Sequence, residues 1–239
     1  MDLLKDASRR RLVVSGLSGL VAAAATPAFA QTPKTVMDGV EAGPAMNWDH
    51  FLTAFRPEAI RLLKEKRVSP ESYIRRLSSE VVSVSGIPDV ALKPIPWMRP
   101  EMRFAVLAPG VPFMATQWAM DPGAQQPCHN HPNASVCTLV THGELLIENF
   151  EIDGSNDAPK FGERVVVRLT RRERLVAGRT SVLTHGENNL HRLTAGPQGA
   201  SGVDLNTLHG KQAPFGYLLL TPVSAGVDWF EGTWYDPSV

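Results

Sequence analysis

Between residues 113 and 222 the chain repeats one pattern: a short run rich in Val, Leu, Ile and Phe, followed by a turn signal. The runs recur roughly every 8–12 residues, a spacing that is typical of an antiparallel sandwich or barrel. We therefore predict an all-β fold for this region. The predicted strands are residues 113–120, 136–140, 144–151, 164–169, 180–183, 190–194, 203–208 and 217–222.

Glycine, proline and charged clusters mark the predicted turns between these strands. Among them are the pairs His142–Gly143 and Gly196–Pro197. The charged run at residues 171–174 is interpreted as a solvated turn, because it mixes three arginines with one glutamate.

Before the strands, residues 47–83 show the apolar spacing of helices. Asn47 is a predicted N-cap, and Ser69 is predicted to cap a second helix that has Pro70 as its first residue. Six prolines between residues 87 and 112 exclude a long helix there. We therefore expect a helical segment at residues 46–98, packed on the outside of a barrel formed by residues 99–239.

The N-terminus has the pattern of a twin-arginine signal peptide. Three consecutive arginines, Arg9 to Arg11, precede an apolar run, and the small residues Ala28 and Ala30 flank Phe29 as signal peptidase requires. We predict a signal peptide at residues 1–30, a linker at 31–45, and a periplasmic or secreted protein with no membrane span in its mature chain. The alternative is an uncleaved N-terminal anchor.

Charge and cysteine content exclude two other classes of protein. The 24 Lys and Arg residues balance the 24 Asp and Glu residues, whereas a nucleic-acid-binding protein needs a clustered basic surface. Two cysteines are too few for a disulfide scaffold. Cys128 and Cys137 could form one disulfide in an oxidising compartment, or they are buried, inert thiols.

Three histidines form the candidate site. His129 and His131 are two residues apart at the end of a further predicted strand, which opens at Pro122–Gly123, so both imidazoles point to one face. His191 begins another predicted strand. Three imidazoles that converge can bind a first-row divalent metal and leave positions open for other ligands. A His-x-His pair alone is equally compatible with a structural role.

Four stretches resemble the cupin superfamily and, within it, the three-histidine thiol dioxygenases, such as cysteamine dioxygenase and the plant cysteine oxidases. The stretches are residues 127–132 (PCHNHP), 139–145 (LVTHGEL), 189–192 (NLHR) and 228–232 (DWFEG). Most cupins have a glutamate three or four residues after the His-x-His pair; residues 134–136 contain none, as in the three-histidine branch.

This resemblance implies a jelly-roll barrel with Fe(II) bound by His129, His131 and His191. It also implies that dioxygen oxidises a small aminothiol, or an N-terminal cysteine, to the sulfinate. Asn206 stands where the family has an acidic residue, and Asp204 lies two residues earlier on the same face, so both are predicted catalytic residues. Two alternatives stay open: a metal-binding cupin without catalysis, and a cupin enzyme that acts on another small molecule.

Overall fold

A computed structural model describes residues 46–65, 69–96, 101–153, 160–184, 189–210, 215–224 and 228–236. All of them belong to one structural unit, Val40–Val239. The predicted signal peptide at 1–30 and the predicted linker at 31–45 lie outside the described residues.

Two helices precede the barrel, as the sequence predicts. α1 spans Trp48–Lys64 and α2 spans Pro70–Val81. The side chain of Asn47 caps α1 by accepting a hydrogen bond from the amide of His50 at 2.9 Å, and Ser69 caps α2 in the same way. Both predicted N-caps are confirmed. None of the helices in the described part of the chain is long and apolar enough to cross a membrane.

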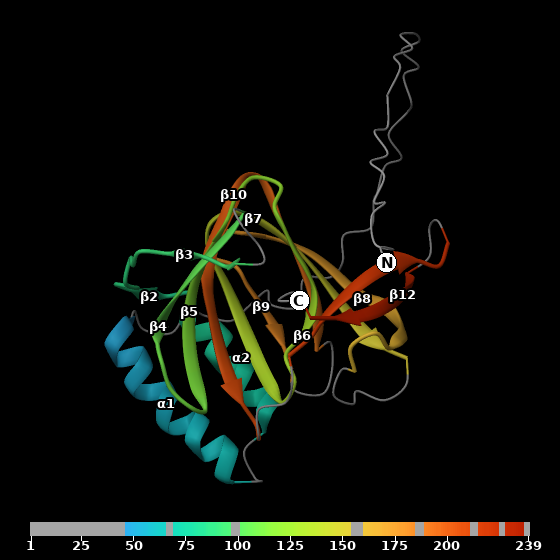
Figure 1. The fold of residues 1–239 in the computed structure, drawn as a ribbon. Helices are drawn as coiled ribbons and strands as arrows, with labels where there is room; N and C mark the ends of the chain where they lie inside the picture. Colours follow the sequence, from blue (N-terminus) through green and yellow to red (C-terminus); the bar gives the residue numbers. More distant parts are fainter. Residues whose placement is uncertain are drawn as a thin grey trace, which may run out of the picture. The chain divides into compact units, whose positions relative to one another are not determined.

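The rest of the described chain consists mainly of strands (Figure 1). The strands are β1 (Met46–Asn47), β2 (Val84–Ser85), β3 (Lys93–Pro94), β4 (Met102–Ala108), β5 (Phe113–Met120), β6 (Gln125–Asn130), β7 (Ala134–Ile152), β8 (Arg164–Val176), β9 (Thr180–Leu183), β10 (Leu190–Leu208), β11 (Tyr217–Pro222) and β12 (Trp229–Tyr235).

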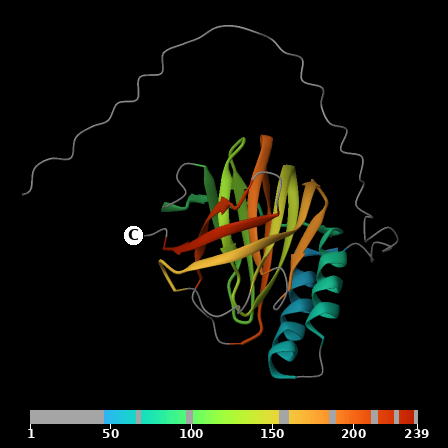
Figure 2. The same cartoon turned by 90° about the vertical axis from the view of Figure 1, so that its right-hand side faces the viewer.

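The sheet closes on itself. β1 and β2 form a separate parallel pair, and the other ten strands pair in the order β3-β4-β5-β10-β6-β11-β12-β8-β7-β9. Because β7 also pairs with β10, six strands form a closed antiparallel ring: β7, β10, β6, β11, β12 and β8. β8 and β12 run side by side across the direction of the other strands (Figure 2). The predicted all-β barrel with an N-terminal helical segment is confirmed.

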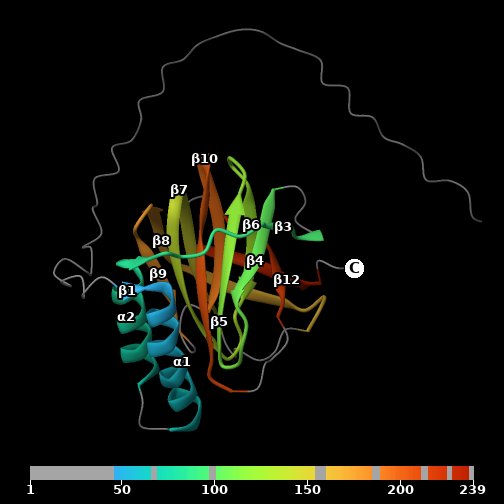
Figure 3. The same cartoon turned by 90° about the vertical axis from the view of Figure 1, so that its left-hand side faces the viewer.

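Three clusters of buried apolar residues hold these layers together. Phe51 and Phe55 of α1 and Leu77 of α2 pack on β7 and β10, so the helices cover one face of the sheet (Figure 3). Another cluster draws buried residues from every strand of the closed ring: Cys128, Phe150, Val167, Leu190, Leu218, Phe230 and Trp234. Each strand of the ring therefore buries one of its faces inside it.

Three predicted turns are wrong, because strands continue through them. β7 runs through His142–Gly143, and β10 runs through Gly196–Pro197. The register of β7 and β10 shifts between Ala195 and Ala200, where Gly143 has φ +72° and a Cβ atom would overlap the carbonyl oxygen of Gly199. The two glycine signals therefore mark a bulge between long strands.

The charged run at 171–174 is also part of a strand. In β8, Arg172 and Arg174 form ion pairs with Glu148 and Glu144 on β7. The alternating arginines are therefore cross-strand partners of acidic residues.

Candidate metal centre

Neighbouring strands bring the three predicted histidines together. His129 on β6 and His191 on β10 are direct partners in the antiparallel register. His131 follows the last residue of β6, and both the backbone carbonyl and the side-chain oxygen of Asn189 accept a hydrogen bond from its amide, at 3.2 and 2.6 Å. Asn189, just before His191, thus ties the two histidine-bearing segments together.

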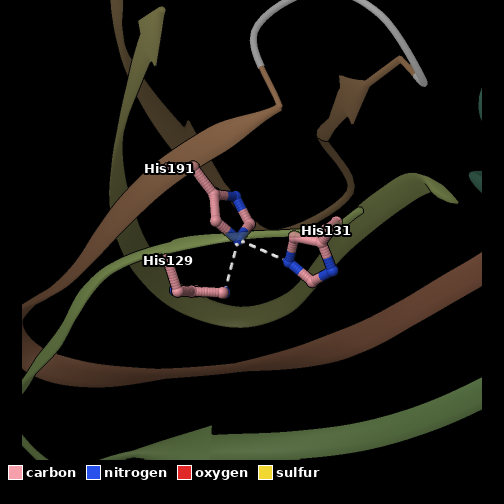
Figure 4. A group of neighbouring side chains, drawn as sticks. All are labelled: His129, His131 and His191. Atoms are coloured by element: carbon pink, nitrogen blue, oxygen red, sulfur yellow. Dashed lines mark hydrogen bonds between the residues drawn. The ribbon is translucent and has the colours of Figure 1, made fainter. Parts of the chain in front are cut away.

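The ring nitrogens converge on one point (Figure 4). Nε2 of His191 lies 2.9 Å from Nε2 of His129 and 3.1 Å from Nε2 of His131. His129 and His191 are each only 2% exposed, whereas His131 is half-buried. The site is therefore reached from the side of His131.

The hydrogen bonds leave lone pairs without donors. Nδ1 of His129 lies 2.8 Å from the carbonyl oxygen of Pro127. A carbonyl only accepts, so Nδ1 carries the proton and Nε2 of His129 carries a lone pair. His191 has at most one proton on Nε2 and cannot donate to both neighbours at once. A cation at the centre would satisfy all three nitrogens. Their separations of 2.9 and 3.1 Å suit ligand atoms that are each about 2.0–2.1 Å from one ion.

Burial keeps these imidazoles neutral. It lowers the pKa of His129 to about 4. Burial and the neighbouring histidines lower the pKa of His131 and of His191 well below the usual value. Neutral imidazole is the form that binds metal ions, so the site is ready to bind at neutral pH.

No carboxylate or thiolate joins this cluster among the residues that the structure describes. Cys128, next to His129, points to the other face of β6 and lies in the core of the ring. A donor set of three neutral nitrogens suits Fe, Zn, Cu or Ni and leaves the full charge of a divalent ion uncompensated.

An aromatic wall, which the sequence did not indicate, borders the histidines. The ring centres of Phe215 and Tyr217 lie 5.3 and 5.5 Å from that of His129, and Tyr235 lies 5.9 Å from Tyr217. Tyr217 is the register partner of His129 on β11. In the sequence, Phe215 and Tyr217 are visible as an aromatic pair two residues apart. The sequence does not show that Tyr217 pairs with the strand of His129.

The two predicted catalytic residues lie on β10, beyond its bulge. Asp204 accepts a hydrogen bond from the indole N–H of Trp118 at 3.1 Å, and burial raises the pKa of Asp204 to about 6. Asn206, two residues further, shares its face. Neither residue is part of the histidine cluster. Their catalytic role stays a prediction.

Among the described residues, neither cysteine and no other histidine joins this cluster. Cys128 and Cys137 are free and buried in different cores, and burial raises the pKa of both thiols, to about 12 for Cys137. Of the two alternatives for this pair, a disulfide or buried and inert thiols, the structure therefore supports the thiols. His142 is exposed, Nε2 of His209 is 2.8 Å from Oγ of Ser135, and His185 lies outside the described residues.

No family model matches this chain, and no curated protein sequence matches it. Several solved structures match in part. KdgF from Halomonas sp. is 18% identical over 50% of this chain and 88% of its own, with a TM-score of 0.36. The cupin domain of Cnp3 from Schizosaccharomyces pombe is 16% identical over 52% of this chain and 72% of its own, with a TM-score of 0.35.

A structure of oxalate oxidase in complex with the substrate analogue glycolate is 22% identical over 52% of this chain and 58% of its own, with a TM-score of 0.36. At these values the similarity carries no inference about activity or substrate. The barrel and the histidine cluster of this chain are compatible with a metal-dependent enzyme.

Proposed function

We propose that this protein is an Fe(II)-dependent thiol dioxygenase that oxidises a small aminothiol, or an N-terminal cysteine, to the sulfinate. One observation carries the proposal: among the residues that the structure describes, three neutral imidazoles converge without a carboxylate, two of them buried and one half-buried. The resemblance of residues 127–132 and 189–192 to the three-histidine thiol dioxygenases supports it further.

The charge of the site favours an anionic sulfur ligand. A divalent ion on three neutral nitrogens keeps its charge of two, and burial of His129 and His191 lowers the local dielectric. An anion that replaces water there is bound more strongly than it would be in solvent. A thiolate fits, because iron accepts both imidazole and sulfur ligands.

Bound iron would supply the Lewis acidity that deprotonates the thiol and the redox chemistry that lets dioxygen react with sulfur. The reaction balances as R–SH + O₂ → R–SO₂H, with both oxygen atoms transferred to sulfur.

The side chains of the protein position the reactants. The hydrogen bond from His129 to Pro127 fixes which ring nitrogen faces the centre. Phe215 and Tyr217 exclude water from one side. We assign Asp204 and Asn206 to binding the substrate amine, whose positive charge a carboxylate would accept.

The proposal includes the cellular location. Export by the twin-arginine route would deliver a folded, metal-loaded protein to the periplasm or beyond. A periplasmic fraction that contains the protein without residues 1–30 is the expected result. A protein that keeps these residues and stays with the membrane would instead match the uncleaved anchor.

The test measures oxygen uptake by purified protein loaded anaerobically with Fe(II). The substrates are cysteamine, cysteine and a peptide that begins with cysteine, and ethanolamine serves as the control without sulfur. Uptake with at least one thiol, with a product that has gained two oxygen atoms, is the expected result. Bound iron without uptake on any thiol would contradict the thiol activity, and bound zinc or nickel without uptake would favour a non-catalytic metal-binding protein.

A further inference from the structure

A buried amide without a hydrogen-bond partner lies beside the histidines. Asn149 on β7 is 1% exposed, and neither Oδ1 nor Nδ2 of its side chain has a partner among the described residues. Burying two polar atoms unpaired is unfavourable, and leucine would place the same number of side-chain heavy atoms there without that cost. Packing of the fold alone therefore does not account for an asparagine at this position.

The strand register places this amide at the site. Asn149 is the direct partner of His191 in the pairing of β7 with β10, and His191 is the partner of His129 in the pairing of β10 with β6. Direct partners share one face of a sheet, with Cβ atoms about 4.5–5.5 Å apart. Asn149, His191 and His129 thus form one row across three strands.

The backbone of Asn149 has a hydrogen-bond partner although its side chain has none among the described residues. The hydroxyl of Thr170 on β8 donates to the carbonyl oxygen of Asn149 at 3.1 Å. The register of β7 and β8 shifts between Asn149 and Phe150. Such a bulge redirects a side chain relative to a regular strand, and bulges are common next to functional sites.

His191 lacks the partner that a metal-binding histidine needs. Its Nε2 faces the other two histidines, while its second nitrogen lies on the far side of the ring (Figure 4). None of the described residues accepts a hydrogen bond from that Nδ1 atom, whereas Nδ1 of His129 already donates to Pro127. A histidine that binds metal through Nε2 carries its proton on Nδ1 and almost always donates it to a nearby acceptor.

We propose that Asn149 is a positioning residue of the metal centre. When an ion occupies the site, Oδ1 of Asn149 accepts a hydrogen bond from Nδ1–H of His191, which fixes the tautomer and the orientation of that ring. The orphaned acceptor and the orphaned donor satisfy each other. This inference rests on the metal site of the proposed function and not on the oxidation of a thiol.

The test compares metal affinity with the stability of the metal-free protein. Asn149→Leu removes both polar atoms and keeps the number of side-chain heavy atoms, and Asn149→Asp keeps an acceptor. Affinity for Fe(II) and Co(II) is measured by competition with a chelator, and stability by unfolding of the metal-free protein in urea. We expect Asn149→Leu to bind either metal roughly 10- to 100-fold more weakly, with unchanged or increased stability, and Asn149→Asp to retain wild-type affinity.

Ser135→Ala is the matched control. Ser135 is a buried polar residue of the same strand whose Oγ lies 2.8 Å from Nε2 of His209, outside the histidine cluster. This variant is expected to lose stability and to keep metal affinity.

Three results would overturn the inference. They are wild-type affinity in Asn149→Leu, a loss of affinity that Asn149→Asp does not restore, and no metal binding by the wild-type protein. Metal binding that depends on Asn149, without thiol-dependent oxygen uptake, would support the inference and contradict only the proposed function.

Discussion

At the three histidines, the fold holds nitrogen lone pairs that no donor in the described part of the chain satisfies together. His129 is limited to one tautomer by Pro127, and His191 lies within 3.1 Å of two other ring nitrogens. Each unpaired buried group costs about 1–3 kcal/mol. A single cation would remove this cost at every nitrogen, so the chemistry of each residue indicates a metal.

Asp204 has the second unusual environment at the residue scale. Burial raises its pKa to about 6, so the ionised carboxylate is disfavoured in the folded state. The stability that this shift contributes is present below the ordinary pKa of about 4 and is lost as the pH rises through about 6. The side chain of the Asp204→Asn variant cannot ionise, so this variant does not lose stability in that way.

We therefore expect the free energy of unfolding of the Asp204→Asn variant, relative to that of the wild type, to increase as the pH rises from 4 to 7. The gain should be on the order of 1–3 kcal/mol. Urea unfolding of both proteins across this range measures it. Parallel pH profiles would show that the carboxylate of Asp204 ionises normally.

At the scale of elements, β7 and β10 determine the architecture. Each has 19 residues, and each pairs with the other along nearly its whole length. The bulge at Gly143 lets both strands bend where β10 changes its other neighbour from β6 to β5. This bend brings His191 into register with His129.

Gly143→Ala tests the bulge, and Gly178→Ala is its control. Both glycines have positive φ, at +72° and +81°, but only a Cβ atom at Gly143 would meet the backbone of Gly199. We expect Gly178→Ala to lower the free energy of unfolding by about 1–2 kcal/mol. Gly143→Ala should lower the free energy of unfolding by clearly more, because the backbone of Gly199 must also move. Equal losses would mean that the two strands do not approach closely there.

Local patterns predicted most elements but not their long-range partners. The predicted strands at 113–120 and 217–222 coincide with β5 and β11, because a short apolar run of strand length is a local property of the sequence. A glycine with positive φ suits both a turn and a bulge, so Gly143 was misread. Spacing indicated the three histidines. Asn149 and Tyr217 could not be found, because they join the site only through pairing with distant strands.

At the scale of the whole unit, the helices share a core with the sheet. Phe55 of α1 is fully buried, with its ring centre 4.7 Å from that of Phe51, and the hydroxyl of Tyr73 on α2 is 3.0 Å from Oγ1 of Thr207 on β10. Helices and barrel should therefore unfold together.

Phe55→Ala should lower the free energy of unfolding by about 3–5 kcal/mol while unfolding stays a single transition. Ile60→Ala on the same helix is the control. Ile60 is 41% exposed, so this variant should lower the free energy of unfolding by much less. Far-UV circular dichroism follows the helices, and tryptophan fluorescence follows the barrel once Trp48 of α1 is replaced by Phe in every protein compared. A helical transition that precedes the barrel transition would contradict a shared core.

The most direct test of the metal centre is an anaerobic titration of metal-free protein with Fe(II), counting bound ions per chain. The wild-type protein should bind one ion. His191→Ala should stay folded and lose most of its bound iron, whereas His142→Ala, which changes an exposed histidine outside the cluster, should still bind one ion. A wild-type chain that binds no iron, or a His191→Ala variant that binds it fully, would show that these histidines are not a metal site.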